Sequence, residues 1–156
     1  MFTLTDAPFD AIVTGIPTTQ VEAKVGVPIW SDRKQYLITS ISDELLGATL
    51  FQPNHYVKAG TMSIDSNKDA EVFVALYIGD NREGGLMEAL PADGWTLKSD
   101  WYIEWSNQHK LSKVWSKNIK AGETISFTST VDRLTFAILI KEGNNIVGLV
   151  KVIIDT

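Results

Sequence analysis

Few side chains in this sequence have the type and spacing that catalysis requires. Histidine occurs twice, at His55 and His109, without the spacing of paired metal ligands and without a nucleophile motif nearby. The sequence contains no lipase-type G-x-S-x-G, zinc-protease H-E-x-x-H, phosphate-binding glycine loop or dinucleotide-binding fingerprint. Asp80 and Glu83 could act as an acid and a base, but any acidic loop offers such a pair. We therefore predict a protein that is not an enzyme.

The segment 79–85, G-D-N-R-E-G-G, holds the candidate for a metal ion. Asp80, Asn81, Glu83 and backbone carbonyls could supply the hard oxygen ligands of Ca²⁺. The calcium-loop pattern D-x-[DN]-x-[DN]-G is absent, and a solvated acidic loop explains the same residues. We therefore predict no cofactor and keep Ca²⁺ as an alternative at this loop.

The five tryptophans are the unusual feature of the composition. An indole face can pack on the flat C–H patches of a pyranose ring, and nearby polar side chains then bond the sugar hydroxyls. Trp95 follows Leu90–Gly94, which predicts a loop, and Trp115 alternates with Lys113 and Lys117. Both tryptophans have two interpretations: a sugar contact, or a large residue that fills the space of about 10 Å between two packed sheets.

The other three tryptophans are expected to be structural. Trp101 and Trp105 alternate with Tyr102 and Glu104, so strand geometry places the two indoles on one face and the polar residues on the other. This contrast favours the core for Trp101 and Trp105. Trp30 lies at the end of a predicted strand.

Strands must position all of these residues, because apolar residues recur at period two and rarely at the helical period. The run 72–78 is apolar on both faces, which predicts a central strand between two covered faces. Two further clear strands are predicted at 134–140 and 146–154, joined by a hairpin loop. Weaker strands are predicted at 10–14, 19–25, 36–41, 48–51, 61–65, 101–105, 110–117 and 124–128, and a single helical turn at 43–46.

This pattern of short strands and frequent turn signals predicts an all-β fold. We expect an antiparallel β-sandwich of jelly-roll type, with about ten short strands and little helix. The length suits one domain, over residues 1–156.

Composition excludes several classes of function. Without cysteine the chain has no disulfide, no thiolate zinc site and no cysteine nucleophile. Acidic residues outnumber basic ones by 19 to 14, so we predict no nucleic-acid binding. The longest apolar runs, 72–78 and 134–140, are far shorter than the roughly 20 residues that span a bilayer, so we predict no membrane insertion. Residues 1–15 carry two aspartates and no basic residue, unlike a secretory signal. A cytosolic protein and an extracellular domain without its leader both fit these features.

Several short motifs share an order with a known group of domains. They are W-S-D-R-K-Q-Y-L-I-T-S-I (30–41), L-L-G-A-T-L-F (45–51), V-F-V-A-L-Y-I-G-D (72–80), L-P-A-D-G-W (90–95), V-W-S-K (114–117) and A-G-E-T-I (121–125). In this order the chain resembles β-sandwich accessory domains, similar to carbohydrate-binding modules, that are attached to secreted bacterial polysaccharide-degrading enzymes. The resemblance implies a carbohydrate-binding or adhesion role without catalytic residues. It also implies ligand contacts at Asp80, Arg82 and Trp95.

Two functional hypotheses follow. The first is a non-catalytic carbohydrate-binding module, with Trp95, Trp115, Asp80 and Arg82 at the ligand. The alternative is a structural or assembly protein that associates with itself or docks on a protein partner, because aromatic side chains also serve protein interfaces.

Overall fold

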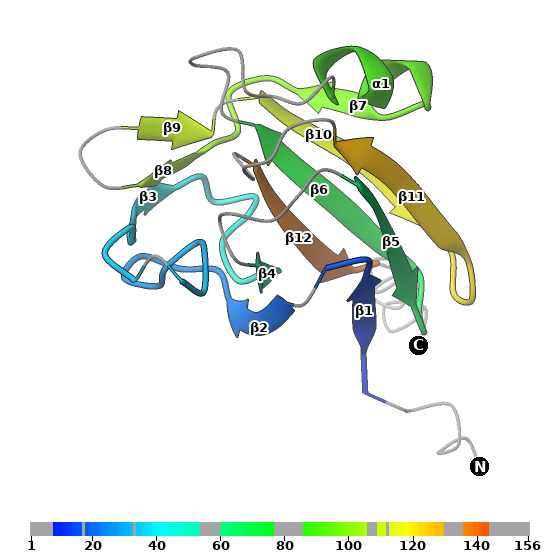
Figure 1. The fold of residues 1–156 in the computed structure, drawn as a ribbon, viewed down its shortest axis with the longest axis horizontal. Helices are drawn as coiled ribbons and strands as arrows, with labels where there is room; N and C mark the ends of the chain where they lie inside the picture. Colours follow the sequence, from blue (N-terminus) through cyan, green and yellow to red (C-terminus); the bar gives the residue numbers. More distant parts are fainter. Residues whose placement is uncertain are drawn as a thin grey trace, which may run out of the picture.

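The computed structural model describes residues 8–16, 18–32, 34–53, 60–76, 86–105, 109–111, 113–129 and 136–143. Within these ranges the chain is built mainly from β-strands (Figure 1). No described helix is long and apolar enough to cross a membrane.

The described residues form twelve strands and one short helix. In chain order they are β1 (Ala11–Thr14), β2 (Thr18–Glu22), β3 (Ile38–Ile41), β4 (Thr49–Pro53), β5 (Gly60–Ser66), β6 (Ala70–Leu76), α1 (Leu86–Ala92), β7 (Thr96–Lys98), β8 (Ile103–Trp105), β9 (His109–Leu111), β10 (Lys113–Ile119), β11 (Thr124–Ser129) and β12 (Phe136–Glu142).

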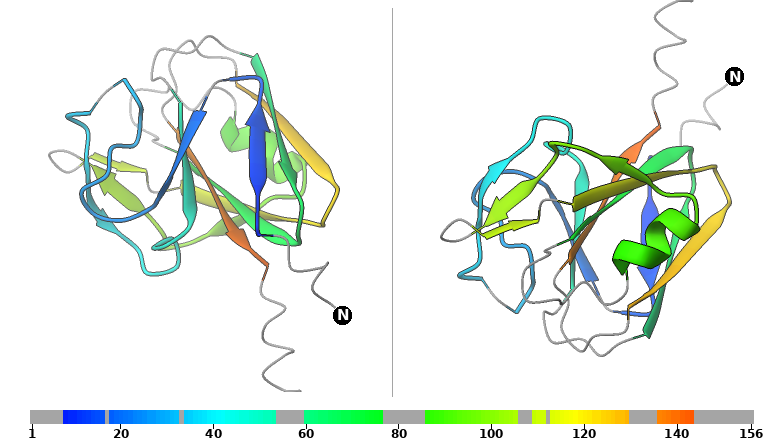
Figure 2. Two further views of the ribbon diagram at one scale, coloured as in Figure 1. Left: turned by 90° about the horizontal axis from the view of Figure 1, so that it is seen from below. Right: turned by 90° about the horizontal axis from the view of Figure 1, so that it is seen from above.

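The strands make three sheets, and every strand pairing is antiparallel. A six-stranded sheet has the order β2-β4-β12-β6-β10-β7, and the two three-stranded sheets have the orders β1-β5-β11 and β3-β8-β9. Figures 1 and 2 show the strands of the large sheet between the two small sheets. The predicted all-β antiparallel sandwich with little helix is therefore confirmed.

Each face of the six-stranded sheet has its own hydrophobic core. The first core lies toward β1-β5-β11 and contains Val72, Val74 and Leu76 of β6. The second core contains Phe73 and Ala75 of β6, with side chains from β3, β8, β9 and the segment 23–48. Alternate residues of one strand thus enter opposite cores, as the pleat of a strand requires. The prediction of a central strand covered on both faces is confirmed over 72–76.

Other predicted elements need correction. The residues Leu90–Ala92, predicted as part of a loop, end the helix α1, and only residues 93–94 form a turn. The predicted strand 110–117 is divided between β9 and β10, and β7 was not predicted. Residues 43–47 form turns in which the N–H of Leu46 donates to the carbonyl of Ser42 at 3.2 Å, as in the predicted single helical turn, and Gly47 follows with a φ of +86°. The predicted strand 146–154 lies outside the described residues.

Candidate functional site

Of the four predicted ligand contacts, two lie outside the described residues and two are buried. Asp80 and Arg82 are outside the described residues, as are Asn81 and Glu83 of the calcium alternative. Trp95 and Trp115 are described, and only 4% and 8% of their surfaces are exposed. In the part of the chain that the structure describes, no group of three His, Asp or Glu side chains is arranged to hold a metal ion.

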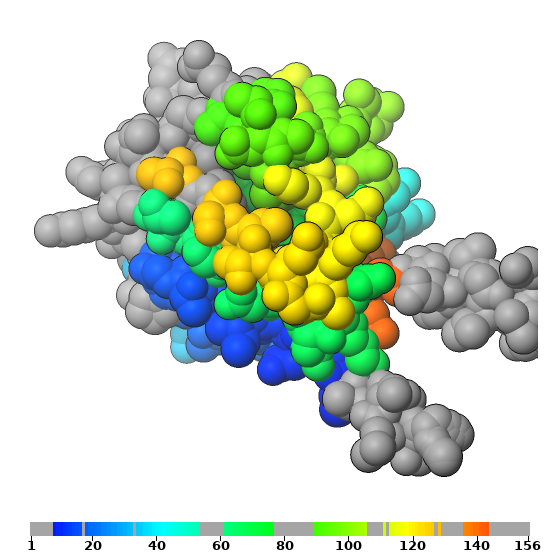
Figure 3. Space-filling view, turned by 90° about the vertical axis from the view of Figure 1, so that its right-hand side faces the viewer, coloured from blue at the N-terminus to red at the C-terminus, as the bar shows by residue number. Residues whose placement is uncertain are grey.

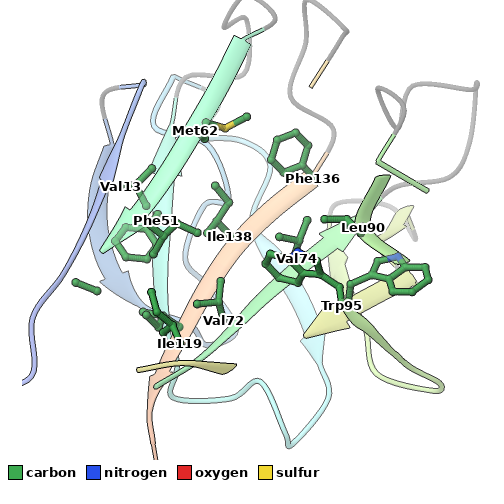
Figure 4. Packing of buried hydrophobic residues seen from close by; sticks show 14 of the residues in the cluster. Val13, Phe51, Met62, Val72, Val74, Leu90, Trp95, Ile119, Phe136 and Ile138 are labelled. Carbon is green, nitrogen blue, oxygen red and sulfur yellow. The ribbon is translucent and has the colours of Figure 1, made fainter. Parts of the chain in front are cut away.

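Trp95 is a core residue although it lies in a loop. Its backbone N–H donates to the carbonyl of Leu90 at 3.0 Å, which folds the chain back at the end of α1. It belongs to the core between the large sheet and β1-β5-β11, which also contains Leu90 of α1 and Val74 of β6 (Figure 4). The apolar residues of this core therefore cover the ring, for which the sequence alone allowed a ligand contact.

Trp115 belongs to the same core. It stands on β10 between Leu97 of β7 and Val74 of β6. Lys117 shares its face of the strand, and its ammonium donates to the carbonyl of Asp93 at 2.8 Å. An indole must expose a face to stack on a sugar, so the candidate site has to be built from other residues.

The described residues line an open pocket of about 610 Å³ beside Trp101, on the opposite face of the large sheet from Trp95 and Trp115. Its volume is within the usual range of small-molecule sites. We call it the Trp101 pocket. It is lined by Glu44, Ala70, Glu71, Phe73, Trp101, Asn118, Lys141, Glu142 and Gly143.

Three neighbouring strands bring the polar side chains of this pocket together. Glu71 of β6 lies directly opposite Asn118 of β10 on one side and Lys141 of β12 on the other. All three lie on the face of the sheet that carries Phe73 and the second core. The face is apolar where the segment 23–48 and β3-β8-β9 pack on it, and it becomes polar in this row.

The indole of Trp101 forms the aromatic wall of the pocket. The ring is half-buried, and its centroid lies 5.8 Å from that of Phe73 at an interplanar angle of 54°. The ammonium of Lys98 lies 5.3 Å from the centroid of the indole, which is a cation–π distance. Lys98 does not line the pocket.

The backbone on both sides of Trp101 is fixed. Asp100, directly before it, has a φ of 70°, in the left-handed region that aspartate tolerates better than most residues. Tyr102, directly after it, donates its N–H to Ser42 Oγ at 3.1 Å and accepts the N–H of Ser42 at 3.0 Å. The phenol of Tyr102 also bonds to Ser40 Oγ at 2.8 Å. Trp101 is therefore held in place before any ligand arrives.

The polar side chains of the pocket are available to a ligand. Within the described ranges, the side chains of Glu71, Asn118 and Lys141 have no hydrogen bond or ion pair. Glu142 differs, because its carboxylate pairs with the ammonium of Lys68 at 3.7 Å. A carboxylate accepts hydrogen bonds, an ammonium donates them and an amide does both. Together these groups match hydroxyls, each of which is both donor and acceptor.

The rim of the pocket depends on a close backbone contact. The N–H of Gly143 donates to the carbonyl of Asp69, and a Cβ on Gly143 would lie 2.6 Å from that oxygen. The Asp69 carboxylate in turn accepts the N–H of Ala121 at 2.9 Å. Asp69 thus ties the end of β12 to the turn between β10 and β11.

A second pocket, of about 410 Å³, lies beside β2 and the start of β4. Its lining has no aromatic residue and consists of Gln20, Val21, Glu22, Gly47, Ala48 and Thr49. It offers a sugar no stacking surface, so the Trp101 pocket is the better candidate.

Sequence reasoning grouped Trp101 with Trp105, and the structure separates them. Both are half-buried and pack against the second core. Trp105 lies against Trp30 and Tyr36, with both ring centroids at 5.1 Å, whereas Trp101 lines the pocket. In the sequence, Glu71 could have indicated the Trp101 pocket, because it is a charged residue within an otherwise apolar strand.

No family model matches this chain, and no curated protein matches it. Two solved structures have a similar fold. A GH138 enzyme targeting pectin rhamnogalacturonan II gives a TM-score of 0.62 at 20% identity, over 86% of this chain and 16% of the enzyme chain. A beta-glucuronidase from glycoside hydrolase family 2 gives a TM-score of 0.61 at 13% identity, over 85% of this chain and 13% of the enzyme chain.

The chain therefore spans only about a sixth and an eighth of the length of these two structures. At such low identity the likeness concerns the fold alone. This β-rich fold therefore also occurs as a small part of two glycoside hydrolase chains.

Proposed function

We propose that this protein is a non-catalytic carbohydrate-binding domain and that its ligand lies in the Trp101 pocket. The observation that carries the proposal is the meeting of a half-buried indole in one pocket with three polar side chains, those of Glu71, Asn118 and Lys141, that have no partner among the described residues. A pyranose ring needs both kinds of contact, because it has apolar C–H patches and hydroxyls.

The similar structures support a carbohydrate context for this fold. Their names describe an enzyme that targets a pectin and a beta-glucuronidase, and the chain matches a small fraction of each. A match of that size suits an accessory domain better than a whole enzyme. The absence of known catalytic motifs from the sequence agrees with this role.

The experiment is a glycan array followed by titration of intrinsic tryptophan fluorescence with the oligosaccharides that bind. We expect Trp101→Phe to weaken binding about tenfold, because the smaller ring loses stacking area and the indole N–H. Trp105→Phe is the matched control. It makes the same change in a half-buried tryptophan on the same stretch of chain, outside the pocket, and should leave binding unchanged.

Asn118→Ala provides a second variant in which the fold is not at risk. Asn118 is exposed and its side chain has no partner in the described chain, so stability should change by less than about 0.5 kcal/mol. Loss of one hydrogen bond to a sugar should weaken binding about threefold to tenfold. If neither Trp101→Phe nor Asn118→Ala changes the affinity for the glycan, the binding site lies elsewhere on the protein.

Light scattering on the same samples tests the alternative, a structural or assembly protein. Mass that rises with concentration, together with no response to any glycan, would favour self-association over carbohydrate binding.

A further inference from the structure

The arrangement of the tryptophans and the polar row restricts the form of glycan that the Trp101 pocket can take. Resting on the proposed function, we infer that the pocket binds a short segment of a single soluble glycan chain, about two or three sugar residues long, and not the surface of a crystalline polysaccharide.

The tryptophans argue against a flat binding platform. A crystalline surface would need several aromatic faces that are exposed and coplanar. All five tryptophans are described, and Trp30, Trp95 and Trp115 are buried. The two half-buried indoles have different neighbours. Trp101 is tilted against Phe73 inside the pocket, and Trp105 stands at 88° to Trp30. Three of the five indoles are thus buried, and of the other two only Trp101 lines the pocket.

The polar row sets the length of the ligand. Asn118, Glu71 and Lys141 stand on three adjacent strands, so the row is about 10 Å long, twice the spacing of neighbouring strands. Trp101 forms the aromatic wall of the same pocket. Sugar residues beyond this row would lie past its three polar side chains and add little affinity.

The outer face of the sheet β1-β5-β11, which we call the flat face, serves as the internal comparison. On the outer face of β1-β5-β11, Thr61 bonds to Thr128 at 2.8 Å and Ser63 bonds to Ser126 at 2.9 Å. Figure 3 shows residues of β5 and β11 side by side on this side of the molecule. These hydroxyls bond to one another, and the described side chains of the face include no aromatic ring.

The test compares ligand length and ligand form. Oligosaccharides of one to six residues from the gluco-, xylo-, manno- and galacto- series are titrated, and sedimentation with microcrystalline cellulose and with chitin is measured in parallel. We expect affinity in the bound series to rise about tenfold from one residue to three, then to change less than about twofold up to six. Neither solid should remove the protein from solution.

The outcomes separate this inference from the proposed function. If no soluble or solid glycan binds, both are overturned. If affinity keeps rising to six residues, or if a solid binds the protein, the inference is overturned and carbohydrate binding stands.

Two variants show which face of the protein binds the glycan. Trp101→Phe should abolish the dependence of affinity on oligosaccharide length, and Ser126→Arg on the flat face should not affect it. Binding to a solid that Ser126→Arg removes and Trp101→Phe leaves intact would assign the ligand to the flat face and overturn the inference.

Discussion

At the scale of single residues, glycines decide how closely backbones approach each other. Gly15 has a φ of +99°, and a Cβ there would lie 2.3 Å from the carbonyl oxygen of Thr61. Gly26 has nearly the same φ, +97°, but nothing lies within 4 Å of a Cβ at that position. The two positions therefore separate the cost of a left-handed backbone from the cost of a steric clash.

We predict that Gly15→Ala destabilises the protein more than Gly26→Ala does. Gly26→Ala should lower the free energy of unfolding by about 1–2 kcal/mol, the cost of a left-handed alanine. Gly15→Ala should cost about 1–3 kcal/mol more, because the backbone at Thr61 must move away. Urea denaturation measures both values, and equal losses would contradict the close approach of Gly15 to Thr61.

At the scale of elements, β12 serves both cores with adjacent residues. Ile138 packs in the core toward β1-β5-β11, and Leu139 packs in the opposite core. On β1 the same alternation leads to a different result, because that strand is covered on one face only. Its Ile12 is 51% exposed, while Ala11 and Val13 are buried.

We predict that Ile138→Ala and Leu139→Ala each lower the free energy of unfolding by about 2–5 kcal/mol, since each leaves a cavity in a packed core. Ile12→Ala, the control on the outer face of β1, should change it by less than about 0.5 kcal/mol. Chemical denaturation of the three variants checks this. A small effect at either β12 position would mean that the core on that side is not closely packed.

At the scale of the whole molecule, the two cores cannot separate without breaking the six-stranded sheet. Strands β4, β6, β10 and β12 contribute side chains to both cores. Trp95 and Trp115 lie in one core and Trp30 in the other, so tryptophan fluorescence reports on both.

We predict a single cooperative unfolding transition, as expected of one domain. Far-UV circular dichroism follows the strands. The fluorescence of the triple variant Trp30→Phe/Trp101→Phe/Trp105→Phe follows the first core through Trp95 and Trp115, and that of the double variant Trp95→Phe/Trp115→Phe follows the second core. Within each protein the two signals should have the same midpoint. Different midpoints for the two signals in one variant would show that the cores unfold independently.

The sequence by itself determined the fold class and the central strand. Alternation of apolar residues is a local property, because the pleat of a strand assigns neighbouring residues to opposite faces. The run Val72–Leu76, apolar on both faces, therefore predicted its own burial correctly. The same local reasoning missed α1, since a helix of seven residues shows too little of the helical period.

Only the tertiary structure decided which residues surround a pocket. Period two assigns Trp101 and Trp105 to one face, but it cannot say where the covering layer on that face ends. It also cannot say which strands are neighbours. The pocket's polar row consists of residues that are far apart in the chain, Glu71, Asn118 and Lys141. They meet because β6 pairs with β10 on one side and with β12 on the other, and the two registers place Asn118 and Lys141 opposite Glu71. Strand partners and register depend on long-range packing, and that packing buried Trp95 and Trp115 and left Trp101 at the candidate site.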